Sequence, residues 1–225
     1  MQVLAECEAR ANWAVVQDLV WAMDDYLSLQ GYWTERLTLL ETGITAAQQS
    51  GQRDNEAEFF NRLGLVYRDL GQVEQAIDYY EQALAIAREI GHRQGEGNQL
   101  GNLGLAYRDL GQVEQAIDYY QQALTIAREI GHRQGEGSHL GNLGNAYSAL
   151  GQVERAIAYY QQALAIAREI GHRQGEGNRL GNLGLAYRDL GQVEQARSYL
   201  EQALAIFEAI KSPTAERVRT WLAEL

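Results

Sequence analysis

Apolar residues along most of the chain follow the period of an α-helix. Within residues 100–110 and again within residues 113–130 they recur three and four positions apart, which places them on one face of a helix. Gly111 separates the two runs, and glycine ends helices readily because it adopts the left-handed backbone conformation without a steric penalty. No segment alternates apolar and polar residues for long enough to predict a strand. The pattern therefore predicts pairs of helices joined by short glycine turns, in an all-α fold.

This pair of helices recurs with a period of 40 residues. Residues 94–133 and 134–173 differ at eight positions, and residues 54–93 and 174–211 are looser copies. A fixed period of this size is typical of repeat arrays in which each unit buries its apolar face against its neighbours. We therefore expect four regular repeats over residues 54–211, with helices of roughly 16–19 residues, about 25 Å long at 1.5 Å per residue.

The start of the chain departs from the repeat. Residues 1–53 predict a degenerate N-terminal repeat, in which Gly31 keeps the turn glycine and Asp24 replaces a glycine of the regular copies. Asn12 is placed to cap the first long helix, because its side chain can accept hydrogen bonds from unpaired backbone N–H groups. The chain opens on a helical segment without a capping signal, so we expect it to begin inside a longer protein.

The end of the chain, residues 212–225, predicts a capping helix. A serine and the only proline open this segment, which is a typical helix start. Four apolar residues then share one face: Val218, Trp221, Leu222 and Leu225. We expect this face to be buried against the second helix of the fourth repeat, near Leu204 and Phe207. Arg197 stands where the other regular repeats have an isoleucine, which indicates that the array ends there.

A set of small and aromatic residues recurs at fixed offsets in the regular copies. In the second of them it consists of Leu103, Gly104, Tyr107, Gly111, Ala116, Tyr120 and Ala123. These offsets resemble those of the tetratricopeptide repeat (TPR), although the period here is 40 residues and the common TPR period is about 34. The longer form resembles the arrays of kinesin light chains and cell-polarity adaptors, and the C-terminal sensor regions of bacterial STAND signalling ATPases.

The resemblance implies a fold and a function. The fold would be a right-handed α-α superhelical solenoid of TPR helix pairs. The function would be that of a protein–protein interaction module, which binds a peptide or protein segment in its concave groove as the sensor part of a larger bacterial signalling protein. The alternative is a structural scaffold that self-assembles by end-to-end stacking, since near-identical repeats have complementary ends. A consensus-built array is a third option, against which the irregular ends argue.

By the same resemblance, the first helix of each pair lines the groove. The candidate binding residues are then Arg68, Asn98, Asn102, Leu105, Arg108, Asp109, Asn142, Asn145, Ser148, Asn178, Asn182, Leu185 and Arg188. Asn102, Asn142 and Asn182 recur at one position, and a primary amide both donates and accepts hydrogen bonds, so it can hold the backbone of an extended peptide. The arginines can pair with carboxylates in a bidentate manner. The alternative is that these side chains are solvated or pair among themselves.

The second and third repeats differ mainly on this face. Four of their eight differences map to it, and they leave Asn145, Ser148 and Ala149 as a smaller, uncharged patch in the third repeat. Such a patch could receive a bulky side chain of a bound segment, or the differences could be drift on a solvent-exposed surface.

Charge and composition narrow the class of partner. The formal net charge of −11 disfavours nucleic acid and anionic membranes as partners. No apolar run approaches the ~20 residues of a membrane span, and no signal-peptide pattern opens the chain. Cys7 is the only cysteine, so no disulfide framework is expected. We expect a cytoplasmic protein with a protein or peptide ligand.

No residue pattern predicts catalysis, a metal or a cofactor. The only lysine, Lys211, lies outside the glycine-rich helices, so these lack the lysine of a phosphate-binding loop and we interpret their glycines as sites of close helix packing. His92, His132 and His172 form a row of turn residues, and a row cannot converge on one ion. His139 has no evident partner. No nucleophile, base and orienting acid can be assembled, so we expect a non-enzyme.

Overall fold

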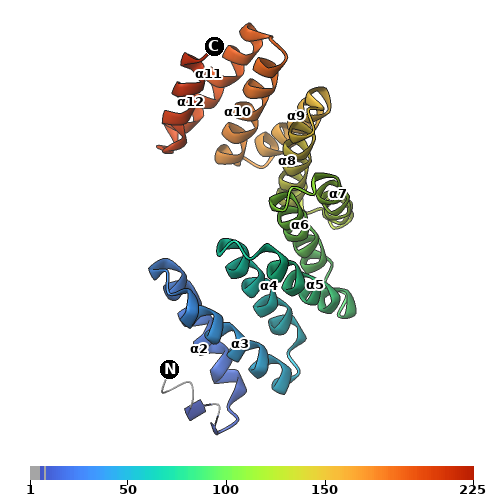
Figure 1. The fold of residues 1–225 in the computed structure, drawn as a ribbon, viewed down its shortest axis with the longest axis vertical. Helices are drawn as coiled ribbons and strands as arrows, with labels where there is room; N and C mark the ends of the chain where they lie inside the picture. Colours follow the sequence, from blue (N-terminus) through green and yellow to red (C-terminus); the bar gives the residue numbers. More distant parts are fainter. Residues whose placement is uncertain (1–5, 8) are drawn as a thin grey trace. The chain divides into compact units, whose positions relative to one another are not determined.

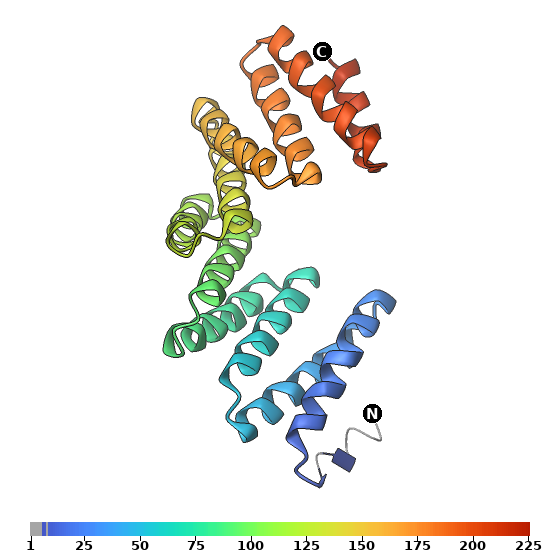
Figure 2. The ribbon, with the colours of Figure 1, turned by 180° about the vertical axis from the view of Figure 1, so that it is seen from behind.

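The computed structural model describes residues 6, 7 and 9–225, and every regular element in that part of the chain is a helix (Figures 1 and 2). In chain order the long helices are α2 (Trp13–Gln30), α3 (Trp33–Ser50), α4 (Arg53–Asp69), α5 (Val73–Glu89), α6 (Arg93–Asp109), α7 (Val113–Glu129), α8 (Arg133–Ala149), α9 (Val153–Glu169), α10 (Arg173–Asp189), α11 (Val193–Ala209) and α12 (Thr214–Ala223). The prediction of an all-α fold is confirmed. None of these helices combines the length and the apolarity that a membrane span requires.

The helices explain the period of the sequence. Each helix from α4 to α11 has 17 residues, and three turn residues separate each of these helices from the next, so helix and turn together recur every 20 residues. The turns share one geometry. Gly71 has a φ of +75°, its N–H donates to the carbonyl of Arg68, and the N–H of Gln72 donates to the carbonyl of Tyr67. This Schellman arrangement satisfies the last carbonyls of a helix and favours glycine at the left-handed position.

The chain forms two compact units, residues 1–110 and residues 111–225. Unit 1 contains α2 to α6 and unit 2 contains α7 to α12. Within each unit, every helix packs against the next helix in sequence, as a solenoid of helix pairs requires.

Gly64 and Gly144, within first helices, are sites of close packing. A Cβ on Gly64 would lie 2.4 Å from the ring of Tyr80, and one on Gly144 would lie equally close to the ring of Tyr160. Since real Cβ atoms do not approach other atoms so closely, the tyrosine of the second helix needs a bare backbone on the first. This confirms the interpretation of these glycines as packing positions.

A buried glutamate links the end of each regular repeat to the start of the next. In unit 2, Glu136 on α8 accepts a hydrogen bond from Arg128 Nε on α7 at 2.9 Å and another from Arg133 on its own helix. The same group recurs around Glu96 and Glu176. Burial raises the pKa of such a carboxyl, but the two arginines outweigh it at Glu96, whose pKa lies below its ordinary value.

The two ends follow the expectations in part. Asn12 occupies the capping position of α2, but its side chain makes no capping hydrogen bond, because its ψ of 66° differs from the extended geometry of a capping asparagine. At the other end α12 packs against α11. There Val218 is fully buried, whereas Trp221, Leu222 and Leu225 are half-buried around Phe207.

Candidate functional site

All the predicted binding residues lie on the first helices of the helix pairs. We call the surface formed by α4 and α6 the A-helix face of unit 1, and that formed by α8, α10 and α12 the A-helix face of unit 2. Unit 1 carries Arg68, Asn98, Asn102, Leu105, Arg108 and Asp109. Unit 2 carries Asn142, Asn145, Ser148, Asn178, Asn182, Leu185 and Arg188.

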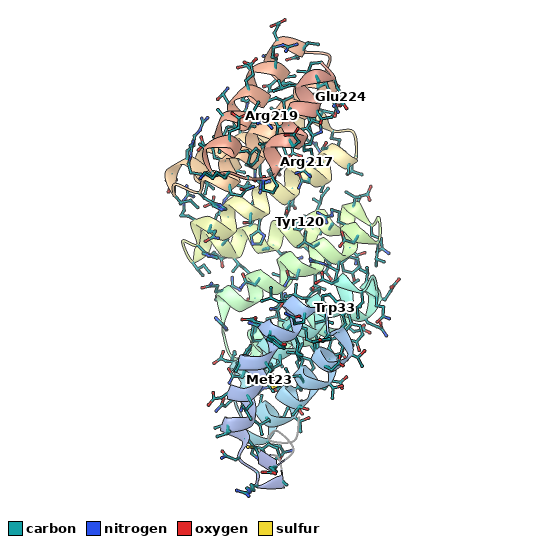
Figure 3. The ribbon with its side chains drawn as sticks, turned by 90° about the vertical axis from the view of Figure 1, so that its left-hand side faces the viewer. Met23, Trp33, Tyr120, Arg217, Arg219 and Glu224 are labelled. Atoms are coloured by element: carbon teal, nitrogen blue, oxygen red, sulfur yellow. The ribbon has the colours of Figure 1, made fainter. Side chains whose placement is uncertain are left out.

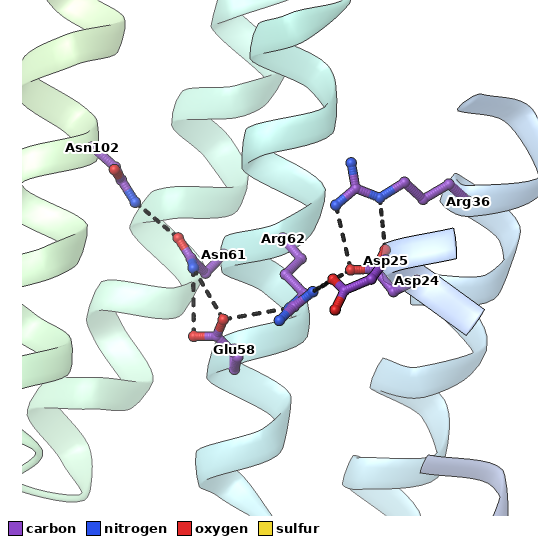
Figure 4. A network of polar contacts seen from close by, with 7 residues as sticks. All are labelled: Asp24, Asp25, Arg36, Glu58, Asn61, Arg62 and Asn102. Carbon is purple, nitrogen blue, oxygen red and sulfur yellow. Dashed lines mark hydrogen bonds and ion pairs between the residues drawn. The ribbon is translucent and has the colours of Figure 1, made fainter. Parts of the chain in front are cut away.

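In unit 1 a network of the chain's own polar groups occupies the A-helix face (Figure 4). The amide of Asn102 donates to Asn61 Oδ1 at 2.8 Å, and the amide of Asn61 lies 3.4 Å from the carboxylate oxygens of Glu58. Glu58 in turn pairs with Arg62. The row of equivalent asparagines therefore does not extend to α4. The position 40 residues before Asn102 holds Arg62, and the hydrogen-bond partner of Asn102 is instead Asn61.

The network ends in a buried ion group that the sequence analysis did not foresee. Asp24 is fully buried and accepts hydrogen bonds from Arg36 Nε at 2.6 Å and from Arg62. Burial alone would raise the pKa of Asp24, but the two guanidinium groups hold it below its ordinary value. Arg62 also lies over the ring of Trp21, with 4.8 Å between Cζ and the ring centroid. Asp24, the centre of this ion group, thus occupies the position that the packing glycine Gly64 holds in the next repeat.

The predicted arginines have carboxylate partners within the chain. Asp109 lies 2.7 Å from the guanidinium of Arg108 and 3.9 Å from that of Arg68. Arg188 lies 3.4 Å from Asp189 and 3.6 Å from Glu224. A ligand carboxylate would have to compete with these internal pairs.

The A-helix face of unit 2 contains a pocket of about 350 Å³. We call it the asparagine pocket. Its lining consists of Asn142, Asn145, Gly177, Asn178, Arg179, Gly181, Asn182, Phe207, Thr214, Arg217 and Trp221. It includes two arginines and no carboxylate, in a chain whose formal net charge is −11. The structure thus brings together the four predicted asparagines of this unit.

Hydrogen bonds hold the floor of the asparagine pocket. Asn145 Oδ1 accepts from Tyr160 Oη at 2.9 Å and from the amide of Asn182 at 3.1 Å. Ser148 lies within hydrogen-bonding reach of the same tyrosine hydroxyl, whose pKa is raised to about 12, chiefly by burial. In unit 1 the equivalent hydroxyl, that of Tyr80, is buried without a hydrogen-bond partner. Asn145 and Ser148 therefore satisfy a buried tyrosine, in addition to any contact with a ligand.

Arg179 is the residue of the pocket that the sequence analysis missed. Its guanidinium lies against bare backbone, since a Cβ on Gly141 would fall 2.1 Å from Arg179 Cζ. Burial lowers its pKa, and the nearby Tyr160 opposes that shift. In the part of the chain that the structure describes, no carboxylate lies within ion-pair distance of Arg179. A signal existed, because the equivalent positions in the two preceding repeats hold a glutamine and a histidine, so this position differs in each of the three repeats.

A second arginine completes the pocket from α12. Arg217 lies over the ring of Trp221, with 5.3 Å between Cζ and the ring centroid, and it is labelled on the last helix in Figure 3. The pocket therefore presents two guanidinium groups, primary amides and aromatic rings. These groups can hold a polar backbone, a carboxylate and an apolar side chain together.

The profile of the tetratricopeptide repeat matches the chain four times, over residues 26–89, 55–129, 96–169 and 135–209. The chain belongs to the tetratricopeptide repeat family. These matches confirm the TPR identification made from the recurring residues. A search among curated proteins found no similar sequence.

Solved TPR structures share the fold. BtubC (BKLC) from P. vanneervenii is 23% identical, with a TM-score of 0.80 over 93% of this chain and 86% of that one. The nearly identical TPR-like repeats assigned to a kinesin light chain of Podosopora anserina are 23% identical, with a TM-score of 0.67 over 87% of this chain and 95% of that one. A Rap protein complexed with Competence and Sporulation Factor is 18% identical, with a TM-score of 0.74, and covers 92% of this chain and 58% of that one.

The histidine row and His139 have different environments. His132 takes the capping position of α8 and its ring fills the space above Gly135, where a Cβ would fall 2.6 Å from Nδ1. His139 is buried on α8, its Nδ1 has no hydrogen-bond partner, and its pKa is lowered to about 4, first by burial and then by His132.

Proposed function

We propose that this TPR protein is an interaction module that acts by binding and not by catalysis. Its ligand is an extended peptide or protein segment held on the A-helix face of unit 2. The observation that carries the proposal is the asparagine pocket, where Arg179 has no carboxylate partner among the described residues and no acidic side chain lines the wall.

The pocket and the ligand have complementary chemistry. The amides of Asn142 and Asn178 donate and accept hydrogen bonds, so they suit the backbone of an extended segment of any sequence. The Arg179 guanidinium is half-buried and has no carboxylate partner among the described residues, and a ligand carboxylate would compensate for the water that it has lost. Unit 1 is less suited, because Asn102 and Arg108 are already bound to other side chains of the chain.

The similar structures support this class of function. One Rap protein is described in complex with Competence and Sporulation Factor, so a related fold holds a bound partner. By the resemblance to STAND sensor regions, we propose that the chain is the cytoplasmic sensor part of a larger bacterial signalling protein, in which capture of the ligand relieves inhibition.

A peptide selection on the immobilised chain tests the proposal. A random library of displayed peptides is enriched on the wild-type chain, and the selected peptides are then measured on the folded double variant N142A/N178A. Each lost amide contact should weaken binding by about 0.5–1.5 kcal/mol. Unchanged affinity for the double variant would move the site away from this pocket.

The second candidate function is a scaffold that stacks end to end. The near-identity of two repeats favours it. Against it, α12 covers the apolar face of α11, and Arg197 is exposed where the other copies place a buried isoleucine. Light scattering across a concentration range distinguishes the two, because a stacking scaffold gains mass with concentration and a binding module remains at one mass.

A further inference from the structure

Two pockets with the same architecture lie between consecutive second helices, and they share no lining residue with the asparagine pocket. In unit 1 the pocket between α3 and α5 measures about 430 Å³, and in unit 2 the pocket between α7 and α9 measures about 690 Å³. Their positions correspond at a distance of two repeats, so Tyr67 and Tyr79 in the first become Tyr147 and Tyr159 in the second. The two pockets can therefore be compared residue by residue within one chain.

Stacked tyrosine rings form the same wall in both pockets. The ring centroids of Tyr67 and Tyr79 are 5.1 Å apart, and those of Tyr147 and Tyr159 are 5.3 Å apart. The side chains are half-buried, so each pair presents a rigid aromatic surface to solvent. Such surfaces provide contact area with little loss of conformational entropy.

The charge of the two pockets is opposite. Glu41 and Asp78 line the pocket of unit 1, and the equivalent positions in unit 2 hold Gln121 and Ala158, which are neutral. Unit 2 gains a cation instead, because Arg155 replaces Gln75. The pocket of unit 2 is thus lined by arginine and by no carboxylate, within an acidic chain.

Arg155 is available to a ligand. It lies over the ring of Tyr147, with 5.5 Å between Cζ and the ring centroid, and one N–H donates to Gln152 Oε1 at 2.8 Å. No carboxylate of the described chain lies within ion-pair distance of it. Arg128, which also lines the pocket, is half exposed and uses its Nε for Glu136. The pocket therefore offers one unpaired guanidinium and part of a second.

We propose that this arginine and tyrosine pocket between α7 and α9 binds an acidic segment of a partner protein. Carboxylates of the segment pair with Arg155, and an aromatic or apolar side chain of the same segment packs on the rings of Tyr147 and Tyr159. The site is separate from the asparagine pocket and does not depend on the function proposed for it. Guanidinium groups on aromatic faces are well suited to carboxylates, because they are weakly hydrated and already oriented.

The test uses a fluorescent acidic peptide, acetyl-Glu-Glu-Tyr-Glu-Glu-amide, and the full chain at low ionic strength. The control peptide replaces each glutamate by glutamine. The variant R155Q/A158D gives unit 2 the glutamine and aspartate that the preceding repeat has at Gln115 and Asp118, so its fold should persist, which circular dichroism checks. We expect the variant to bind the acidic peptide about tenfold more weakly, and salt to weaken wild-type binding.

Two further variants make the result decisive. The exchange E41Q/Q75R/D78A should create a second site for the acidic peptide in unit 1, and R179Q tests the asparagine pocket as the alternative site of the acidic peptide. Equal binding of the glutamine peptide, or unchanged binding to R155Q/A158D, would overturn the inference. Binding lost only in R179Q would overturn it too, and would assign the acidic peptide to the A-helix face. If the wild type self-associates and R155Q/A158D abolishes this association, the occupant of the α7–α9 pocket would be a second copy of the chain and not a partner protein.

Discussion

Glu136 shows what one buried side chain contributes to the array. It is 7% exposed and accepts hydrogen bonds from Arg128 and Arg133, which lie on consecutive helices. Replacing it by glutamine removes the charge and leaves two guanidinium groups with a weaker partner. We expect E136Q to lower the free energy of unfolding in urea by about 1–3 kcal/mol.

The same arginine supplies the control for that prediction. Arg133 also pairs with Glu169, which is exposed, and exposed ion pairs contribute little to stability because water screens them. E169Q should therefore change stability much less than E136Q does. Equal effects of the two substitutions would contradict the role assigned to burial.

His139 should make stability depend on pH. Its pKa is about 4 in the folded chain, whereas an unperturbed histidine has a pKa of 6.5, so the unfolded chain binds the proton first as the pH falls. Stability from this residue is therefore complete above pH 6.5 and is lost between 6.5 and about 4, by up to roughly 3 kcal/mol. H139Q, which introduces the residue of Gln99, should flatten the dependence on pH relative to wild type in urea titrations at fixed pH values. Parallel profiles for the two proteins would show that His139 is not buried as a neutral group.

At the scale of single residues the sequence predicted the site in part. The recurrence of Asn142 and Asn182 identified polar positions on the first helices, and the asparagine pocket includes both. Arg179 was missed because the groove positions were taken from the TPR resemblance, and the position of Arg179 is not among them. The partners of Arg68 and Arg108 depend on side-chain reach, which a period cannot reveal.

The packing of helix pairs leads to a prediction at the scale of elements. A Cβ on Gly144 would lie 2.4 Å from the ring of Tyr160, whereas one on Gly181 would lie at an ordinary 3.5 Å from Trp221. G144A should therefore cost about 1–3 kcal/mol through overpacking. G181A should be neutral or stabilise by about 0.5–1 kcal/mol, because alanine favours the helix. Thermal unfolding of both variants checks this, and equal melting temperatures would contradict the packing argument.

The last helix yields a second prediction at this scale. Val218 on α12 is fully buried in the apolar cluster with Phe207 and Leu200, so V218A should lower stability by about 1–3 kcal/mol. Thr220 on the same helix is exposed, and T220A should stay within about 0.5 kcal/mol of wild type. A V218A variant as stable as T220A would show that α12 does not cover α11 in solution.

Elements were easier to predict than sites. The recurring glycines marked the helix ends because their left-handed conformation is local and nearly independent of tertiary contacts. The buried Glu96, Glu136 and Glu176 were overlooked, because a glutamate near a helix start is equally typical of an exposed position. Only packing against the preceding helix brings the second arginine of each group to the glutamate: Arg88, Arg128 or Arg168.

At the scale of the whole molecule, the residues that recur at fixed offsets were sufficient for the TPR family, and the period of 40 residues was sufficient for the fold class. It could not show that the two A-helix faces differ. In unit 1, Asn61 and Arg62 replace a glycine and an asparagine of the next repeat and fill the face with internal hydrogen bonds. In unit 2 the equivalent positions hold glycine and asparagine, and a pocket is left beside Arg179. These differences come from single substitutions against a constant background.

The most direct test of the proposed function follows the Arg179 guanidinium by NMR while a peptide selected on the wild-type chain is added. Binding in the asparagine pocket predicts that the Nε–Hε signal of Arg179 and the amide signals of Asn142 and Asn182 shift together and saturate at one equivalent of peptide. R179Q should then bind the same peptide about tenfold more weakly, as expected for the loss of a charge-assisted hydrogen bond. Saturable shifts confined to α4 and α6, with Arg179 unchanged, would contradict the assignment of the site to unit 2.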